Sequence, residues 1–239
     1  MSRSNKSETA VNPAVKFIEW NSEKGCFKYY DKATKKNIDI PLPTKFYVLD
    51  ILKTIKGFSD STQNGIWSNE VKNLSKQAFK VVTKSKDGKF KTLSEGIYSA
   101  TKDKIKSEGG KFTMSVYAAM VNDQDEYEIV NFQLKGAALS GWVTFENENR
   151  NSVLTDEVIC DDFSKEKKGA TKYTVPVFRT EKATEEGNDA AIELDIQLQE
   201  YLTSYFANTK SDVETEVDEK EYALPKEFDE DPDDESPFK

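Results

Sequence analysis

The sequence predicts a mainly β, α+β domain, and three observations support this fold class. Short segments that alternate apolar with polar residues dominate residues 15–93, and turn-forming residues separate them. Near residue 97 the apolar spacing changes to every fourth residue, and another segment with helical spacing ends near residue 208. We therefore expect strands joined in hairpins, one helix inserted between strands and a helix at the end of the domain.

The first strands are expected to form a meander of hairpins. Residues 15–20, 25–31 and 36–42 alternate in hydrophobicity, and turn-rich segments separate them. Residues 46–56 are apolar enough for either a long strand or a short helix. A strand is favoured, because its neighbours are strands and because the composition from Gly57 to Ser61 predicts a turn.

A second hairpin and a helix are expected next. Strands at 78–84 and 89–93 flank a tight turn at Asp87-Gly88. Ser94 is the candidate N-cap of the helix, and Gly109-Gly110 is its candidate end. Between them, one helical face is marked by Ile97, Thr101 and Ile105.

The remaining segments complete the predicted order. Residues 112–121 and 127–134 predict a hairpin, and residues 136–143 predict the start of a second helix. Pro176 moves strand 171–179 to a sheet edge, because proline has no N–H to donate. Residues 189–208 alternate partly like a strand, but their length without Gly or Pro favours a helix. The cap candidates of this helix are Asn188 and Asp189.

Five strands with a helix between two of them match an OB-like Greek-key barrel, which is the favoured architecture. Residues 13–208 are expected to form this domain, and residues 1–12 a disordered arm. Residues 209–239 are expected to form a disordered acidic interaction tail, because apolar periodicity fades there and acidic residues dominate.

Charge is distributed unevenly along the chain. Residues 1–120 carry a net +10, residues 121–210 a net −9 and residues 211–239 a net −10, which together give the overall −9. A basic half followed by an acidic end predicts a chain that binds a polyanion and has a separate interaction tail.

Composition excludes several classes of site. Without a single histidine, the chain cannot form Ser-His-Asp or Cys-His catalytic sites. Cys26 and Cys160 stand alone, so neither a disulfide framework nor a Cys/His zinc site is expected. The sequence has no phosphate-binding glycine loop, and we expect no cofactor. No apolar run reaches the roughly 20 residues needed to cross a bilayer, so we expect no membrane partner and a cytoplasmic location.

Lysines and aromatic residues interleave through the basic half. Nonspecific single-strand binders need cations that follow the phosphates and flat rings on which bases stack. In strand 25–31, Phe27 and Tyr29 are expected to face the core, which turns Lys28 and Tyr30 outward together. Trp67, in a polar segment, is the best candidate for an exposed ring. The alternative is that these lysines only keep the surface soluble and that the rings only pack in the core, as expected of Phe17, Phe46, Phe79, Phe112 and Phe132.

The DNA-contact candidates are therefore taken from this basic half. They are Trp20, Lys24, Lys28, Tyr30, Lys32, Lys56, Trp67, Lys84, Lys86, Lys89, Lys91, Lys111 and Tyr117.

At the C-terminal end, acidic residues run into Pro237-Phe238. This pattern resembles the tip of single-stranded DNA-binding proteins, and in those families such a tip recruits replication and repair enzymes. Here Lys239 follows Phe238, so the α-carboxylate lies one residue later than in the bacterial family. The resemblance implies partner contacts at Asp233, Asp234, Glu235, Pro237 and Phe238.

The opening hairpin, residues 17–31, and the segment Gly136–Trp142 are similar to those of bacteriophage single-stranded DNA-binding proteins. This resemblance implies an OB-type core, no catalysis and a role in phage DNA replication or recombination. Two alternatives remain open. One is a phage adaptor or inhibitor that acts through protein contacts or DNA mimicry; the other is a metal-dependent nuclease built on Asp161, Asp162, Glu166 and Lys168.

Overall fold

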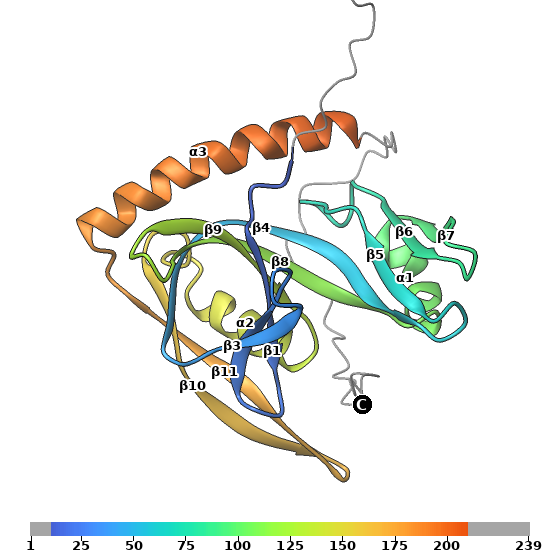
Figure 1. The fold of residues 1–239 in the computed structure, drawn as a ribbon, viewed down its shortest axis with the longest axis horizontal. Helices are drawn as coiled ribbons and strands as arrows, with labels where there is room; N and C mark the ends of the chain where they lie inside the picture. Colours follow the sequence, from blue (N-terminus) through green and yellow to red (C-terminus); the bar gives the residue numbers. More distant parts are fainter. Residues whose placement is uncertain (1–10, 210–239) are drawn as a thin grey trace, which may run out of the picture.

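The computed structural model describes residues 11–209, which form one mixed sheet of eleven strands with three helices (Figure 1). The α+β class is therefore confirmed. The elements follow one another as β1 (Lys16–Asn21), β2 (Cys26–Asp31), β3 (Lys36–Ile40), β4 (Thr44–Ser59), β5 (Asn64–Ser68), β6 (Phe79–Lys84), β7 (Phe90–Gly96), α1 (Tyr98–Ser107), β8 (Gly110–Val121), β9 (Tyr127–Leu134), α2 (Ala137–Glu148), β10 (Glu157–Lys168), β11 (Thr171–Glu181) and α3 (Glu185–Asn208).

The long strand β4 joins the two parts of the sheet. It pairs with β8 along most of its length, while its first residues also pair with β10 and its last residues with β5. The strand order is β3-β2-β1-β9-β8-β4-β5-β6-β7, and β10 and β11 branch from the start of β4. In Figure 1 the β5–β7 part with α1 therefore lies to one side of the strands that surround α2.

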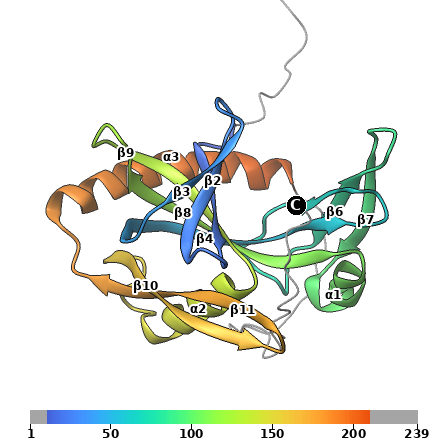
Figure 2. The same cartoon turned by 60° about the horizontal axis from the view of Figure 1, so that its bottom comes forward.

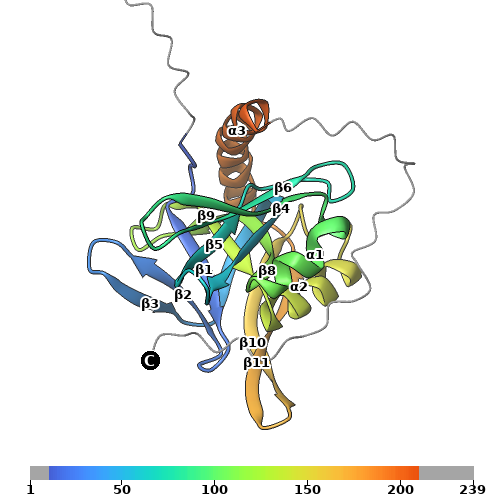
Figure 3. The same cartoon turned by 90° about the vertical axis from the view of Figure 1, so that its right-hand side faces the viewer.

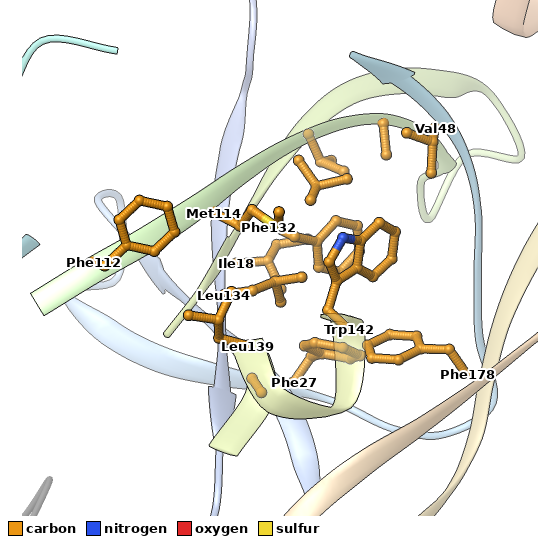
Figure 4. Packing of buried hydrophobic residues seen from close by; sticks show 14 of the residues in the cluster. Ile18, Phe27, Val48, Phe112, Met114, Phe132, Leu134, Leu139, Trp142 and Phe178 are labelled. Atoms are coloured by element: carbon orange, nitrogen blue, oxygen red, sulfur yellow. The ribbon is translucent and has the colours of Figure 1, made fainter. Parts of the chain in front are cut away.

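The main core lies on one face of β1, β2, β4, β8 and β9. Ile18, Phe27 and Phe132 are fully buried there, close to Trp142 of α2 (Figure 4). Trp142 stacks on Phe46 with ring centroids 6.3 Å apart. Burial of each such side chain stabilises the fold by about 1.5–3 kcal/mol. The core therefore holds α2 against the sheet and beside β11 (Figure 2).

Helix α3 covers part of the opposite sheet face. Its Leu198 and Leu202 form a second buried cluster with Tyr117 of β8. The Thr184 side chain caps the helix by accepting a hydrogen bond from the Gly187 N–H at 3.1 Å. A Cβ on Gly187 would lie 2.2 Å from the Tyr47 hydroxyl oxygen, so glycine allows the helix to approach β4 closely at this point.

The β10–β11 hairpin contacts the first hairpin, β1–β2, through backbone and side-chain hydrogen bonds. The Thr174 N–H donates to the Ser22 carbonyl at 2.9 Å, and the Trp20 indole N–H donates to the Thr174 carbonyl at 3.0 Å. β1 itself pairs with β9 in parallel. The first hairpin therefore fills the space between β9 and the β10–β11 hairpin.

Most predicted strands are confirmed, and several details are wrong. The chain does not turn at Gly57, because β4 continues to Ser59 in register with β8 and β5. The polar segment that contains Trp67 is strand β5 and not a loop, since both β4 and β6 pair with it. Strand β10 was not predicted. A bulge between Cys160 and Asp162 interrupts its alternation.

The helices are confirmed, and α2 begins where it was expected, but the predicted starts of α1 and α3 are wrong. Ser94 belongs to β7 and α1 begins at Tyr98, with Ile97 in the N-cap position. The last helix begins at Glu185, before the expected caps Asn188 and Asp189, because Thr184 supplies the capping oxygen. Pro176 does lie in an edge strand, since β11 pairs only with β10.

Candidate nucleic-acid interface

Cross-strand register places the β4 and β5 candidates on one face of the sheet. Lys56 of β4 lies opposite Trp67 of β5 on one side and opposite Lys111 of β8 on the other. Directly opposed residues point to the same face of a sheet. Trp67 in turn lies opposite Val82, and Lys84 is two residues further along β6, so Lys84 points to this face too.

The same face continues to the other end of the sheet. Tyr117 shares the face of Lys111 by alternation along β8 and lies opposite Asn131. Asn131 pairs with Phe17 of β1, and the β1–β2 register continues this face to Lys28 and Tyr30. Seven candidates scattered from residue 28 to residue 117 are therefore brought to one face, although α3 covers one of them, Tyr117.

Helix α3 packs on this face around Leu52, Tyr117 and Ile129. Polar residues of the same face are buried as well, namely Thr54, Thr113, Ser115, Asn131 and Gln133. We call the part beyond α3 the lysine–aromatic face. It consists of Phe17, Lys28, Tyr30, Lys56, Trp67, Lys84, Phe90, Lys111 and Lys135.

Rings and a cation cluster at the β5–β7 end of the face. The rings of Trp67 and Phe90 meet edge to face, with centroids 5.8 Å apart. The Lys84 Nζ lies 5.6 Å from the Phe90 ring centroid. Phe90 is 69% exposed and Trp67 is half-buried, so both rings are held in place by neighbours and still reach the surface. This arrangement can stack a base beside a positive charge.

The centre of the face carries half-buried lysines. Burial lowers the pKa of Lys56, and the carboxylates of Glu70 and Glu19 oppose this shift. Lys135 pairs with Glu19 at 3.3 Å, and Glu19 lies opposite Lys28. An approaching phosphate would favour the charged form of Lys56 and would compete with Glu19 for Lys135.

A buried polar network supports the face from beneath α3. The Tyr117 hydroxyl donates to the Glu70 carboxylate at 2.8 Å, and Ser115 donates to its other oxygen. The Glu70 N–H donates to the Tyr205 hydroxyl of α3 at 2.7 Å. Burial raises the pKa of Glu70, although both hydroxyl donors oppose the shift. The network ties the end of α3 to the segment between β5 and β6.

Tyr117 and Trp20 do not offer rings to a ligand, and this part of the prediction is wrong. Tyr117 is fully buried under α3. Trp20 is half-buried and lies opposite Phe27, on the core side of the sheet, where its indole bonds to Thr174. Both rings fix the structure.

The remaining candidates do not occupy strand positions of the lysine–aromatic face. Lys91 lies opposite the buried Thr83, and so on the other side of the β6–β7 hairpin from Lys84. Lys24, between β1 and β2, is paired with Asp39 at 2.6 Å, which raises the pKa of Lys24. The other candidates are exposed in turns, Lys32 between β2 and β3, and Lys86 and Lys89 between β6 and β7. The proposed tip contacts Asp233, Asp234, Glu235, Pro237 and Phe238 lie outside the described residues.

Sequence reasoning missed three members of the face. Phe17 was expected in the core but is 41% exposed, because it points away from the buried Ile18. Phe90 and Lys135 were not selected. Phe90 could have been found from the strand pairing: Trp67 lies opposite Val82 of β6, and Phe90 lies opposite Lys84, two residues further along β6, so the two rings share a face. This inference requires that residues 64–68 be recognised as strand β5. Of the expected core phenylalanines, Phe46, Phe79, Phe112 and Phe132 are buried.

The carboxylates proposed for a nuclease do not form a metal-binding group. Asp161 is bound by Arg179 at 2.7 Å. Between residues 11 and 209, no three His, Cys, Asp or Glu side chains gather closely enough to hold a metal ion. None of the helices in this range has both the length and the apolar character to span a membrane.

Comparisons with protein-family models, curated proteins and solved structures find no match to this chain. The lysine–aromatic face is therefore interpreted from its own residues.

Proposed function

We propose that the protein binds single-stranded DNA without sequence preference through the lysine–aromatic face. The observation that carries the proposal is the strand register, which joins rings at both ends of one sheet face with lysines between them. Each stacked base contributes about 1–3 kcal/mol and needs no particular sequence. The lysines supply salt-sensitive phosphate contacts.

The extent of the face suits several nucleotides. From β2 to β7 the order β2-β1-β9-β8-β4-β5-β6-β7 contains seven strand-to-strand steps. At ~4.8 Å per step this is an arc of about 34 Å. Because Tyr117, in the row of Phe17, is buried under α3, a single strand would have to run diagonally along β8 to meet Tyr30 and Phe17 first, then lysines, then Trp67 and Phe90.

An OB-like core is the finer fold assignment that we propose, and it supports the same face. Strands β4, β8 and β9, then α2, then β10 and β11 give five strands with a helix between two of them. OB folds bind oligonucleotides on the face of their second and third strands and on the loop between the first and second. These correspond here to β8 and β9 and to residues 60–109, which carry Trp67, Lys84 and Phe90. The parallel pairing of β1 with β9 is an addition to that pattern.

The resemblance to phage single-stranded DNA-binding proteins extends the proposal to DNA replication or recombination. The same resemblance makes the acidic end of the chain a contact for replication or recombination proteins. We take the protein to be a binding protein and not an enzyme.

Titration of fluorescent oligo-dT and of a matched duplex tests the proposal. Both are measured at two salt concentrations, with and without magnesium. We expect tight oligo-dT binding, much weaker duplex binding and a linear fall of log affinity with log salt. Absence of oligo-dT binding at low salt would reject the proposal and favour the adaptor. Magnesium-dependent shortening of the oligonucleotide would favour the nuclease.

A further inference from the structure

Helix α3 has an outward side with an unusual composition. From Glu185 to Asn208 the helix contains six acidic residues and no lysine or arginine. Ile192 and Ile196 are 55% and 59% exposed, although Leu198 and Leu202 on the other side are buried. Nothing between residues 11 and 209 covers the two isoleucines.

The isoleucines form the centre of an acidic surface. With 3.6 residues per turn, Ile192 and Ile196 lie one above the other, and Asp189, Glu193 and Glu200 fall beside them. An apolar centre with a charged rim is the arrangement found in protein–protein interfaces. We call these five residues the α3 surface.

The tip of the β10–β11 hairpin has the opposite charge. Lys167 lies directly opposite Lys172, and Lys165 shares their face by alternation. All three are exposed, and none has an ion-pair partner among residues 11–209. Like charges directly opposite each other destabilise a strand pair, so an acidic partner would relieve the hairpin. The lysine stems also offer apolar surface that the isoleucines can contact.

The two surfaces lie far apart on one molecule. Figures 1 and 3 both show α3 at the top and the tip of the β10–β11 hairpin at the bottom. Neither surface includes a residue of the lysine–aromatic face. Complementary surfaces at opposite ends of a chain fit a contact between copies, which can repeat along a row.

We propose that the α3 surface of one copy docks on the β10–β11 hairpin of a second copy, head to tail. Pairing of two α3 surfaces with each other would place acid against acid, whereas the hairpin supplies the complementary charge. Each added copy leaves one free helix and one free hairpin, so the contact builds rows. The proposal does not depend on DNA binding, since the residues of the two surfaces are separate.

Sedimentation of the full chain without DNA tests the contact. We expect association at ~0.05 M salt that weakens at ~0.5 M, where charges are screened over a few ångströms. A hairpin variant carries Lys167→Glu and Lys172→Glu, and a helix variant carries Glu193→Lys and Glu200→Lys. Each variant alone should associate at least tenfold more weakly than the wild type. A mixture of the two variants should associate again, because the acidic helix of one then meets the basic hairpin of the other.

Circular dichroism and thermal unfolding confirm that both variants fold. Three results would overturn the proposal: a wild type that stays monomeric at low salt, variants that associate as the wild type does, or a mixture that stays monomeric. Self-association of the helix variant would mean that the hairpin binds an acidic segment other than the α3 surface, and this result would also overturn the proposal. A further variant, Ile192→Gln with Ile196→Gln, keeps the charges and should weaken association as well.

Discussion

Replacing Trp67 by alanine removes one of the two rings that meet at the β5–β7 end of the lysine–aromatic face. Trp67 is half-buried and contacts Phe90 edge to face at 5.8 Å. Loss of one stacked base should weaken oligo-dT binding by about 1–3 kcal/mol, or roughly 5- to 140-fold. The fold should lose about 0.5–1.5 kcal/mol through the missing ring pair, in addition to the loss from the buried part of the Trp67 ring.

Trp20→Ala is the matched control, because Trp20 is also half-buried but points to the core side of the sheet. Its indole N–H bonds to Thr174 and its ring meets Phe27 at 4.9 Å. Removing this ring should lower the free energy of unfolding by about 3 kcal/mol, at the low end of the range for large buried side chains. The oligo-dT affinity of the folded fraction should not change.

Fluorescence anisotropy with labelled oligo-dT measures binding, and urea unfolding followed by circular dichroism measures stability. The two variants should separate cleanly: Trp67→Ala binds weakly and folds, whereas Trp20→Ala folds less stably and binds. The assignment of faces is refuted if Trp67→Ala binds oligo-dT as well as the wild type. It is also refuted if the folded fraction of Trp20→Ala loses as much oligo-dT affinity as Trp67→Ala does.

Three further predictions concern charges. Lys84→Gln should reduce the slope of log affinity against log salt by about 0.7, the value for one phosphate contact, while Lys91→Gln on the other side of the hairpin should leave it unchanged. Removal of residues 211–239, with their net −10, should raise oligo-dT affinity most at low salt, and equal affinities there would contradict competition by this segment. Burial raises the folded-state pKa of Glu70, so its contribution to stability is complete below the unfolded value of about 4.3 and is lost as pH rises through the folded value. Glu70→Gln should therefore reduce the dependence of the free energy of unfolding on pH, measured by urea unfolding between about pH 4 and pH 8. The same pH dependence in the variant and the wild type would show that Glu70 is not responsible.

The sequence predicted elements where local pattern and final environment agree. Strand β2 is an example: Phe27 is fully buried, Tyr29 packs against the core, and Tyr30 is 57% exposed, as alternation requires. Strand β5 could not be recognised, because Asn64, Gly65 and Ser68 give it the composition of a loop. Its pairing with both β4 and β6 decides its structure, which is information that only the folded sheet contains.

The geometry of the lysine–aromatic face was predicted only in part. Interleaved lysines and rings led to Lys28, Tyr30, Lys56 and Trp67, all of which share one face. Tyr117 was predicted to contact DNA, and its position in the β8 alternation does place it on this face. It is nevertheless buried, because α3, from a distant part of the chain, covers it. Which strand pairs with which, and what a helix covers, are tertiary facts that local periodicity does not contain.

Tryptophan fluorescence during an oligo-dT titration tests the binding face most directly. The chain has three tryptophans, of which Trp142 is fully buried in the core and Trp20 is bonded to Thr174. We predict that oligo-dT quenches the wild type and Trp20→Phe equally, and that Trp67→Phe loses most of the quenching while anisotropy still shows binding. Undiminished quenching in Trp67→Phe, or no binding of oligo-dT by the wild type at low salt, would contradict the lysine–aromatic face as the DNA site.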